Sequence, residues 1–167
     1  MYGLDENPFC ALLEQGLEPP PGLGIDPDAP CPEFLPTSNF FDDVWRSGDG
    51  ITWEQITDAA GWSPRPGHVC ELVGNQFLCF GGFGLLQNPT DMWVSDDGAE
   101  WTELPTNPWD SADPTAMRYD FDALVIDDAG TGPRVLTFGG DRETFDFTDP
   151  ENYLRIDNDV WTFAPPT

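Results

Sequence analysis

Short apolar and β-branched runs, separated by turns that contain Gly, Asn or Asp, fill most of the chain after its first 38 residues. Two of these runs, at 68–73 and 76–80, are separated only by Gly74-Asn75. Gly-Asn is a two-residue hairpin turn, in which the glycine supplies the positive φ of the first corner. The pattern therefore predicts an antiparallel β-hairpin.

Two further strands are expected at 91–95 and 99–104, with Asp97-Gly98 as the turn between them. Together with the hairpin they predict a sheet of four short strands within residues 61–106.

Both faces of the predicted hairpin are mostly apolar, and Glu71 is an exception that nothing in the sequence explains. Alternation places three apolar side chains on one face and four on the other: Val69, Leu78 and Phe80, and then Cys70, Leu72, Phe77 and Cys79. A strand that is apolar on both faces is covered on both faces. We therefore expect other sheets to pack on both sides of it.

The chain also repeats itself. Residues 43–53 and 91–101 share the pattern Asp-x-Trp-x-Ser-x-Asp-Gly-x-x-Trp, and a partial third copy begins at Asp159. Two arginines each precede an apolar run that ends in Phe-Gly-Gly. The repeated positions are Trp45, Asp49, Gly50, Trp53, Arg65, Gly81, Gly82, Trp93, Asp97, Gly98, Trp101, Arg118, Gly139, Gly140 and Trp161.

This periodicity is typical of repeat architectures, and a four-stranded sheet between similar sheets is a propeller blade. We predict two strands in 39–60, four in 61–106 and three in 107–163. A closed propeller needs at least about four blades of four strands. The chain is therefore expected to be part of a larger propeller, to associate in copies or to stay open, and we favour the first.

The ordered motifs resemble kelch repeats, which are about 50 residues long and build β-propellers. The resemblance rests on Arg-x-Gly-His at 65–68, Phe-Gly-Gly at 80–82, and Asp-Val-Trp followed by a second Trp. It covers 39–163 and implies an all-β, partial kelch-type β-propeller of about two to three four-stranded antiparallel blades. The Ser-x-Asp-Gly-x-x-Trp stretch is also similar to the Asp-box turn of sialidase-type propellers, although one residue shorter.

Residues 1–38 differ from the propeller segment at 39–167. They hold eight prolines and four glycines, without a helix or strand period, and predict an irregular arm or linker. Cys10 and Cys31 bracket the proline-rich part. If they pair, the closed loop would stabilise the arm by about 3.4 kcal/mol in the chain-entropy model.

Cys70 and Cys79 oppose each other in the predicted hairpin, in a non-hydrogen-bonded pair where the Cα atoms are ~4.5 Å apart. We predict a disulfide, the alternative being two reduced thiols that pack as small hydrophobic groups. An even number of cysteines suits an oxidising compartment. We therefore expect a secreted or surface-attached protein, although the acidic start of this chain is not a signal peptide.

The charge is strongly negative. Six Lys+Arg, all of them arginine, stand against 31 Asp+Glu, which gives a net charge of −25. This balance argues against binding to nucleic acid or to anionic lipid. No run of 18 apolar residues is present, so no membrane span is expected.

The candidate chemistry is sparse, and we predict neither catalytic residues nor an obligatory cofactor. His68 is the only histidine, and Phe121 stands at its place in the next repeat, so we expect it to pack. Galactose-oxidase-like enzymes are kelch propellers that hold copper with histidines and tyrosines, and one histidine with three tyrosines argues against that site. The equivalent positions of Arg65 and Arg118 suggest a repeated structural ion pair.

The long spacing before the third copy comes from an acidic insertion that begins at Asp141. Insertions in repeat proteins form loops, commonly on the binding rim. Their oxygen atoms could hold Ca²⁺, although the spacing is not that of an EF-hand and a solvated acidic loop is the alternative. The candidate ligands are Asp141, Asp146, Asp149, Asp157 and Asp159.

Recurrence of five tryptophans predicts that they belong to the core. Trp62 and Trp109 lie instead in the segments between blades, which makes them the better candidates for exposed contact with a sugar or a protein, although we favour packing between blades for both.

The prediction for function is a non-catalytic recognition module that binds a protein or glycan through its blade loops. One alternative is a fragment of a propeller enzyme, a sialidase-like hydrolase or a galactose-oxidase-like oxidase, completed by other blades. Another is a structural segment that self-assembles. Inference from fold to function is analogy.

Overall fold

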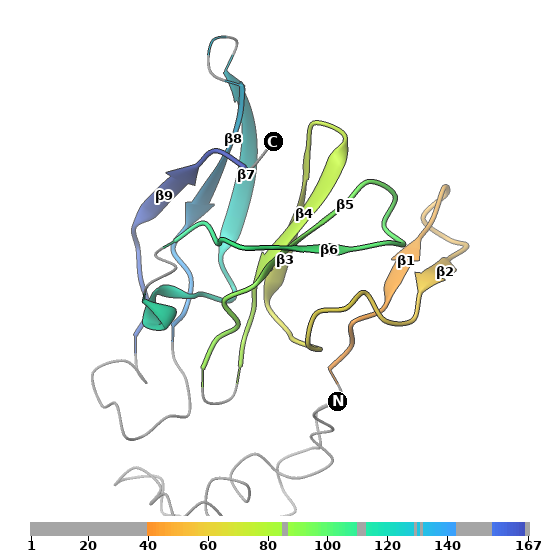
Figure 1. Cartoon of the computed structure of the whole chain (residues 1–167), viewed down its shortest axis with the longest axis horizontal. Helices are drawn as coiled ribbons and strands as arrows, with labels where there is room; N and C mark the ends of the chain where they lie inside the picture. The colour runs from red at the N-terminus through yellow and green to blue at the C-terminus, as the bar shows by residue number, and fades with distance from the viewer. Residues whose placement is uncertain are drawn as a thin grey trace, which may run out of the picture.

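The computed structural model describes residues 40–84, 87–109, 113–128, 130, 132–142 and 155–165. The predicted arm at 1–38, with its Cys10–Cys31 pair, lies outside them. The described chain is all-β apart from one 3-10 turn, η1 (Pro114–Ala116) (Figure 1). Within it, no helix is long and apolar enough to cross a membrane.

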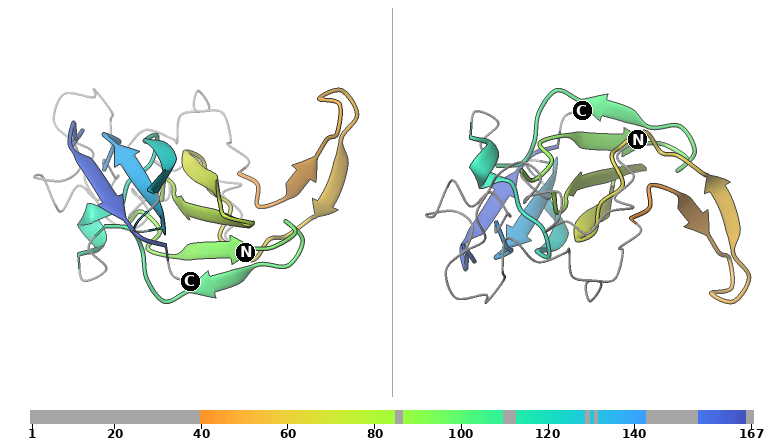
Figure 2. Two further views of the ribbon diagram at one scale, coloured as in Figure 1. Left: turned by 90° about the horizontal axis from the view of Figure 1, so that it is seen from above. Right: turned by 90° about the horizontal axis from the view of Figure 1, so that it is seen from below.

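Three antiparallel sheets contain the strands, and each sheet connects neighbours in chain order. The first has two strands, the second four and the third three, as predicted for 39–60, 61–106 and 107–163. They are β1 (Val44–Arg46) and β2 (Glu54–Thr57); β3 (His68–Val73), β4 (Gln76–Gly81), β5 (Met92–Ser95) and β6 (Thr102–Leu104); and β7 (Asp122–Asp128), β8 (Gly132–Phe138) and β9 (Val160–Phe163). The sheets follow one another across the molecule in Figure 2, with β1–β2 at one end.

The central hairpin has the predicted register. Val73 faces Gln76 across the turn, and Gly74 has φ +64°, the left-handed conformation that glycine adopts without strain. Cys70 faces Cys79 and a disulfide joins them, with a Cα–Cα distance of 4.1 Å.

The fourth strand begins later than predicted, at Thr102 rather than at residue 99. The backbone N–H groups of Ala99 and Glu100 donate to the carboxylate of Asp97, at 2.8 and 3.1 Å. These two residues therefore complete the turn rather than the sheet, because their N–H groups are already used.

The larger core lies between the second and third sheets. Leu78, Phe80 and Met92 come from the second sheet, whereas Phe121 and Val135 come from the segment that leads into the third sheet and from the third sheet itself. Phe80 packs tilted on Phe121, with ring centroids 5.3 Å apart. Aromatic pairs at this distance add to the free energy gained from burying their apolar area.

The other face of the central hairpin is only partly covered, which corrects the expectation of sheets on both sides. Cys79 is buried in a small cluster with Ala60 and Trp62. Leu72 and Phe77, on the same face, remain 56% and 39% exposed. The two-stranded first sheet reaches this cluster through Val44 and leaves the far end of the hairpin open.

Replacing both Cys70 and Cys79 with alanine should lower the free energy of unfolding by about 2.7 kcal/mol, because the closed ten-residue loop no longer restricts the unfolded chain. Urea unfolding of the two proteins would measure the difference. A thiol titration of the unfolded, unreduced protein is the control, and reactive thiols at both positions would contradict the disulfide.

Candidate functional site

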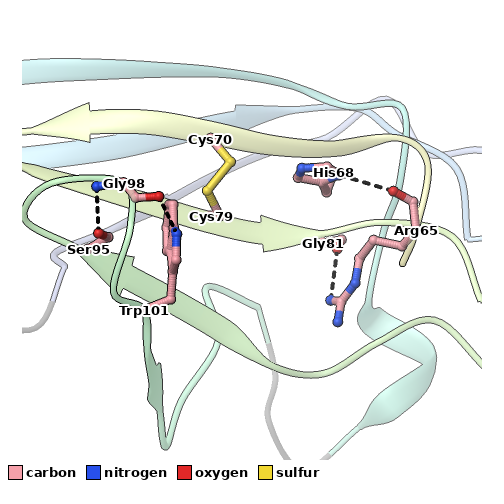
Figure 3. Close-up of a disulfide and its surroundings, with 8 residues drawn as sticks. All are labelled: Arg65, His68, Cys70, Cys79, Gly81, Ser95, Gly98 and Trp101. Atoms are coloured by element: carbon pink, nitrogen blue, oxygen red, sulfur yellow. Dashed lines mark hydrogen bonds between the residues drawn. A yellow bond between two sulfur atoms is a disulfide. The ribbon is translucent and has the colours of Figure 1, made fainter. Parts of the chain in front are cut away.

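A buried arginine joins the two hairpins of the central sheet. The guanidinium of Arg65 binds the carboxylate of Asp91, with Nη2 2.7 Å from Oδ2, and donates to the carbonyl of Gly81 at 3.3 Å (Figure 3). The same carboxylate accepts the indole N–H of Trp93 at 2.8 Å. We call this set, an arginine, a glycine carbonyl, an aspartate and a tryptophan, the arginine clamp.

The third sheet repeats the arginine clamp at the equivalent positions. Arg118 donates to the carbonyl of Gly139 at 2.9 Å and pairs with Asp159, which also accepts the indole N–H of Trp161 at 2.8 Å. The predicted repeated ion pair is therefore confirmed. Sequence analysis did not identify its acidic partner, although the signal was present in the aspartate that begins every copy of the repeat.

The second glycine of each Phe-Gly-Gly makes room for the arginine clamp and its surroundings. A Cβ atom on Gly82, whose φ is +112°, would lie 2.6 Å from Cδ of Arg65. A Cβ atom on Gly140 would lie 2.8 Å from Cβ of Phe121. The N–H of Gly82 donates to the carbonyl of Arg118 at 2.9 Å, so the junction also ties the second sheet to the third.

The clamps keep their aspartates ionised. Burial acts to raise the pKa of Asp91, but hydrogen bonds from Arg65 and Trp93 outweigh it and lower that pKa. The hydrogen bond from Arg118 lowers the pKa of Asp159. Both arginines are almost fully buried, with side chains 3% and 1% exposed. A cation at such a depth requires a charged partner.

In the described chain, no arginine binds the aspartate of the first copy of the repeat. Asp43 accepts hydrogen bonds from the indole N–H of Trp45 at 2.6 Å and from the side chain of Gln55 at 3.2 Å. Trp45 and Trp53 are 48% and 57% exposed and Trp161 is 37% exposed, which corrects the prediction that these three belong to the core. Trp93 and Trp101, the equivalents of Trp45 and Trp53, pack against the buried Trp62, and the first sheet has no such neighbour among the described residues.

Two turns of identical design follow β1 and β5. In the first, Ser47 accepts from the N–H of Gly50 at 2.8 Å, while Asp49 accepts from those of Ile51 and Thr52 at 2.8 and 2.7 Å. The backbone N–H groups of Thr52 and Ile51 lower the pKa of Asp49 to about 2. Ser95 and Asp97 form the second turn in the same way. Figure 3 shows its hydrogen bond between Ser95 and the N–H of Gly98. These aspartates therefore stabilise turns by fixing backbone donors.

His68 lies against the arginine clamp. Its Nδ1 is 3.2 Å from the carbonyl oxygen of Arg65, and its ring centroid is 6.0 Å from that of Trp62 (Figure 3). Burial lowers the pKa of the imidazole. Phe121, its counterpart in the next repeat, is a core residue. Both observations fit packing at this position.

Trp62 and Trp109 are buried, with 6% and 8% of their surface exposed. Trp62 packs edge-on against Trp101 at a centroid distance of 4.6 Å, and Trp109 packs edge-on against Phe121 at 5.0 Å. Their rings fill the space between neighbouring sheets, which is the interpretation favoured from the sequence, and exposed contact with a ligand through these rings is not found.

The acidic insertion is fixed at its base. Asp141 forms isolated β-bridges with Tyr119 and Ile156, and the N–H of Arg142 donates to the carbonyl of Arg155 at 2.9 Å. The buried guanidinium of Arg142 also pairs with Asp157. Backbone and ion pair together hold the two ends of the insertion side by side.

The five candidate calcium ligands do not form one group among the described residues. Asp157 and Asp159 are engaged by arginines, and Asp141 lies in the bridged base. Asp146 and Asp149 lie outside the described residues. Within the described residues, no three His, Cys, Asp or Glu side chains form a group that could hold a metal ion. Calcium binding stays a prediction.

Comparison with models of known protein families gives no match, and neither does comparison with curated proteins. The structural equivalence of the three sheets therefore rests on the internal repeat alone.

Asp91→Asn should lower the free energy of unfolding by about 2 to 3 kcal/mol, because it leaves the buried Arg65 without its countercharge. Asp43→Asn, at the equivalent position without an arginine, should cost less than about 1 kcal/mol. Urea unfolding of both variants measures the contrast. Equal losses would show that the arginine clamp adds nothing at Asp91.

The cost of Asp91→Asn should depend on pH. The pKa of Asp91 is lower in the folded protein than the value of about 3.9 in an unfolded chain, so its ionisation stabilises the fold above about pH 4. This stabilisation is lost as the pH falls through the folded pKa. The difference in unfolding free energy between the wild type and Asp91→Asn should shrink between about pH 5 and pH 2.5, and a constant difference would refute the argument.

Proposed function

We propose that residues 39–167 are part of a kelch-like β-propeller and act as a non-catalytic recognition module. Three features support the propeller arrangement: sheets built as antiparallel meanders, a repeated arginine clamp, and close approach of β3 to β7, the first strands of successive sheets. In a propeller, blades of this kind follow one another around an axis with equivalent strands adjacent.

The main observation in favour of recognition is the set of backbone hydrogen bonds at the base of the insertion. Tyr119 and Asp141 exchange backbone hydrogen bonds of 3.0 and 2.9 Å, and Asp157 donates to Gly140 at 3.0 Å. A loop that leaves such a base is presented from a rigid β scaffold, which is how many proteins build a specific binding surface without catalytic groups.

Charge indicates the chemistry of the partner. Arg65, Arg118 and Arg142 are buried, so three of the six cations of this chain do not face solvent. The carboxylates paired with them, Asp91, Asp157 and Asp159, offset these three charges, so the remaining side chains still carry the strongly negative net charge of the chain. Such a charge favours a protein with a basic face, or an uncharged glycan, over sulfated or sialylated glycans.

The disulfide supports export of the protein, since reduced compartments keep thiols free. The enzymatic alternative, a hydrolase or oxidase fragment completed by other blades, and the self-assembling alternative both stay predictions.

Replacing residues 144–153 with a Gly-Ser linker should abolish binding to an array of basic extracellular proteins and uncharged glycans, while Arg142 and Asp157 keep the base of the loop intact. Exchanging Gly74-Asn75 for Asn-Gly, in a turn at the opposite end of the sheets, is the matched control and should leave binding unchanged. Binding that survives removal of the insertion would refute loop recognition. Turnover of glycoside or alcohol substrates by the full chain would favour the enzymatic alternative.

A further inference from the structure

The first sheet lacks the strands that its counterparts have. β1 occupies the repeat position of β5 and β9, with Asp43-x-Trp45 in the place of Asp91-x-Trp93. β5 is paired on both edges, by β4 and β6, and β9 is paired with β8. β1 is paired with β2 alone in the described chain, so its other edge carries unpaired backbone donors and acceptors.

The side chains along this edge lack the same partners. Asp91 and Asp159 each bind a buried arginine, whereas Asp43 has only Trp45 and Gln55 in the part of the chain that is described. Trp45 and Trp53 are exposed, although their equivalents in the second sheet enclose Trp62. Among the described residues, the edge of β1, the carboxylate of Asp43 and the two aromatic rings thus all lack the partners that one continuous segment supplies in the second sheet.

We infer that the edge of β1 left unpaired among the described residues binds a β-hairpin that lies outside residues 1–167 and carries a Trp-x-x-Arg sequence before its first strand. The arginine completes a third arginine clamp with Asp43 and Trp45. The tryptophan packs between Trp45 and Trp53, and the second strand of the hairpin pairs with β1 as β4 pairs with β5. This is recognition by addition of strands to a sheet edge, with the ion pair and the ring as its specific contacts.

The sequence and the charge indicate that residues 1–167 do not supply this hairpin. Residues 1–38 contain no arginine, so the arm cannot complete the clamp. Arg65, Arg118 and Arg142 are buried in ion pairs, and Arg46 pairs with Glu54. Arg155 lies 3.6 Å from Asp157, and Arg134 lies within β8. A second copy would also bring its own net charge of −25 to the interface, which opposes association. The inference is independent of any ligand of the insertion.

The probe is a fluorescein-labelled peptide of residues 61–84, closed by its own Cys70–Cys79 disulfide, titrated with the full chain. We expect a saturable rise in anisotropy. Arg65→Gln in the peptide, or Asp43→Asn in the protein, should weaken binding at least tenfold. Asp58→Asn, at an exposed position near the same sheet, is the matched control and should have no effect. Binding that is indifferent to Arg65 and Asp43 would overturn the proposal.

A second measurement tests the proposal if the isolated peptide of residues 61–84 does not fold. Residues 61–84 are inserted before residue 40 of the full chain, which should raise the melting temperature by several degrees, and Arg65→Gln in the inserted copy should abolish the rise. Absence of both peptide binding and thermal stabilisation would refute the inference. Sedimentation of the unmodified chain is also informative, because a dimer that Asp43→Asn dissociates would show that the occupant is a second copy, contrary to the proposal.

Discussion

The need to neutralise a buried guanidinium organises this fold. An arginine removed from water is costly unless a carboxylate and further acceptors surround it. Arg65 meets that requirement with groups from three separate points of its sheet: the segment before the first strand, the end of the second strand and the start of the third. Arg118 binds the equivalent groups at the last two points, whereas its Nε has no partner among the described residues. Each cation therefore fixes how the two halves of its sheet meet. The glycines and tryptophans of the repeat follow from this geometry, because the glycine gives the side chain space and the indole holds the carboxylate.

The arginine clamps also lie at the end of the sheets where the repeats differ in length. They lie at the end of the sheets where Gly82 and Gly140 reverse the chain, and the acidic insertion leaves from this same end. Arg142 and Asp157 extend the ion pairing to the base of the insertion, and Arg118 lies within 4.0 Å of Asp157. Half of the six cations of the chain are thus buried in ion pairs that hold the fold together.

Local features were predictable from the sequence, whereas exposure was not. The strands, the Gly74-Asn75 turn, the Cys70–Cys79 register and the pair of arginines follow from alternation, turn chemistry and repetition, which act over a few residues or between copies. Trp45 and Trp53 have the sequence of core residues but lie exposed, because burial depends on a neighbouring sheet that the described chain does not provide. Trp62 and Trp109 lie in segments between sheets and are nevertheless buried, because their rings pack between neighbouring sheets. The position of a residue in the repeat therefore predicts its backbone conformation. Whether its side chain is buried depends on the sheets that pack beside it.

The Cys70–Cys79 disulfide has a consequence for the register of the central hairpin. A closed ring holds each blade between two others, so a slipped strand is corrected by its neighbours on both sides. The central sheet here has only a two-stranded sheet on one flank. Displacement of β4 by one residue would turn Leu78 and Phe80 out of the core, since successive side chains in a strand alternate between faces. The bond between directly opposed sulfur atoms permits a single alignment of β3 with β4. The disulfide therefore keeps Leu78 and Phe80 directed toward the core by a bond within the hairpin itself.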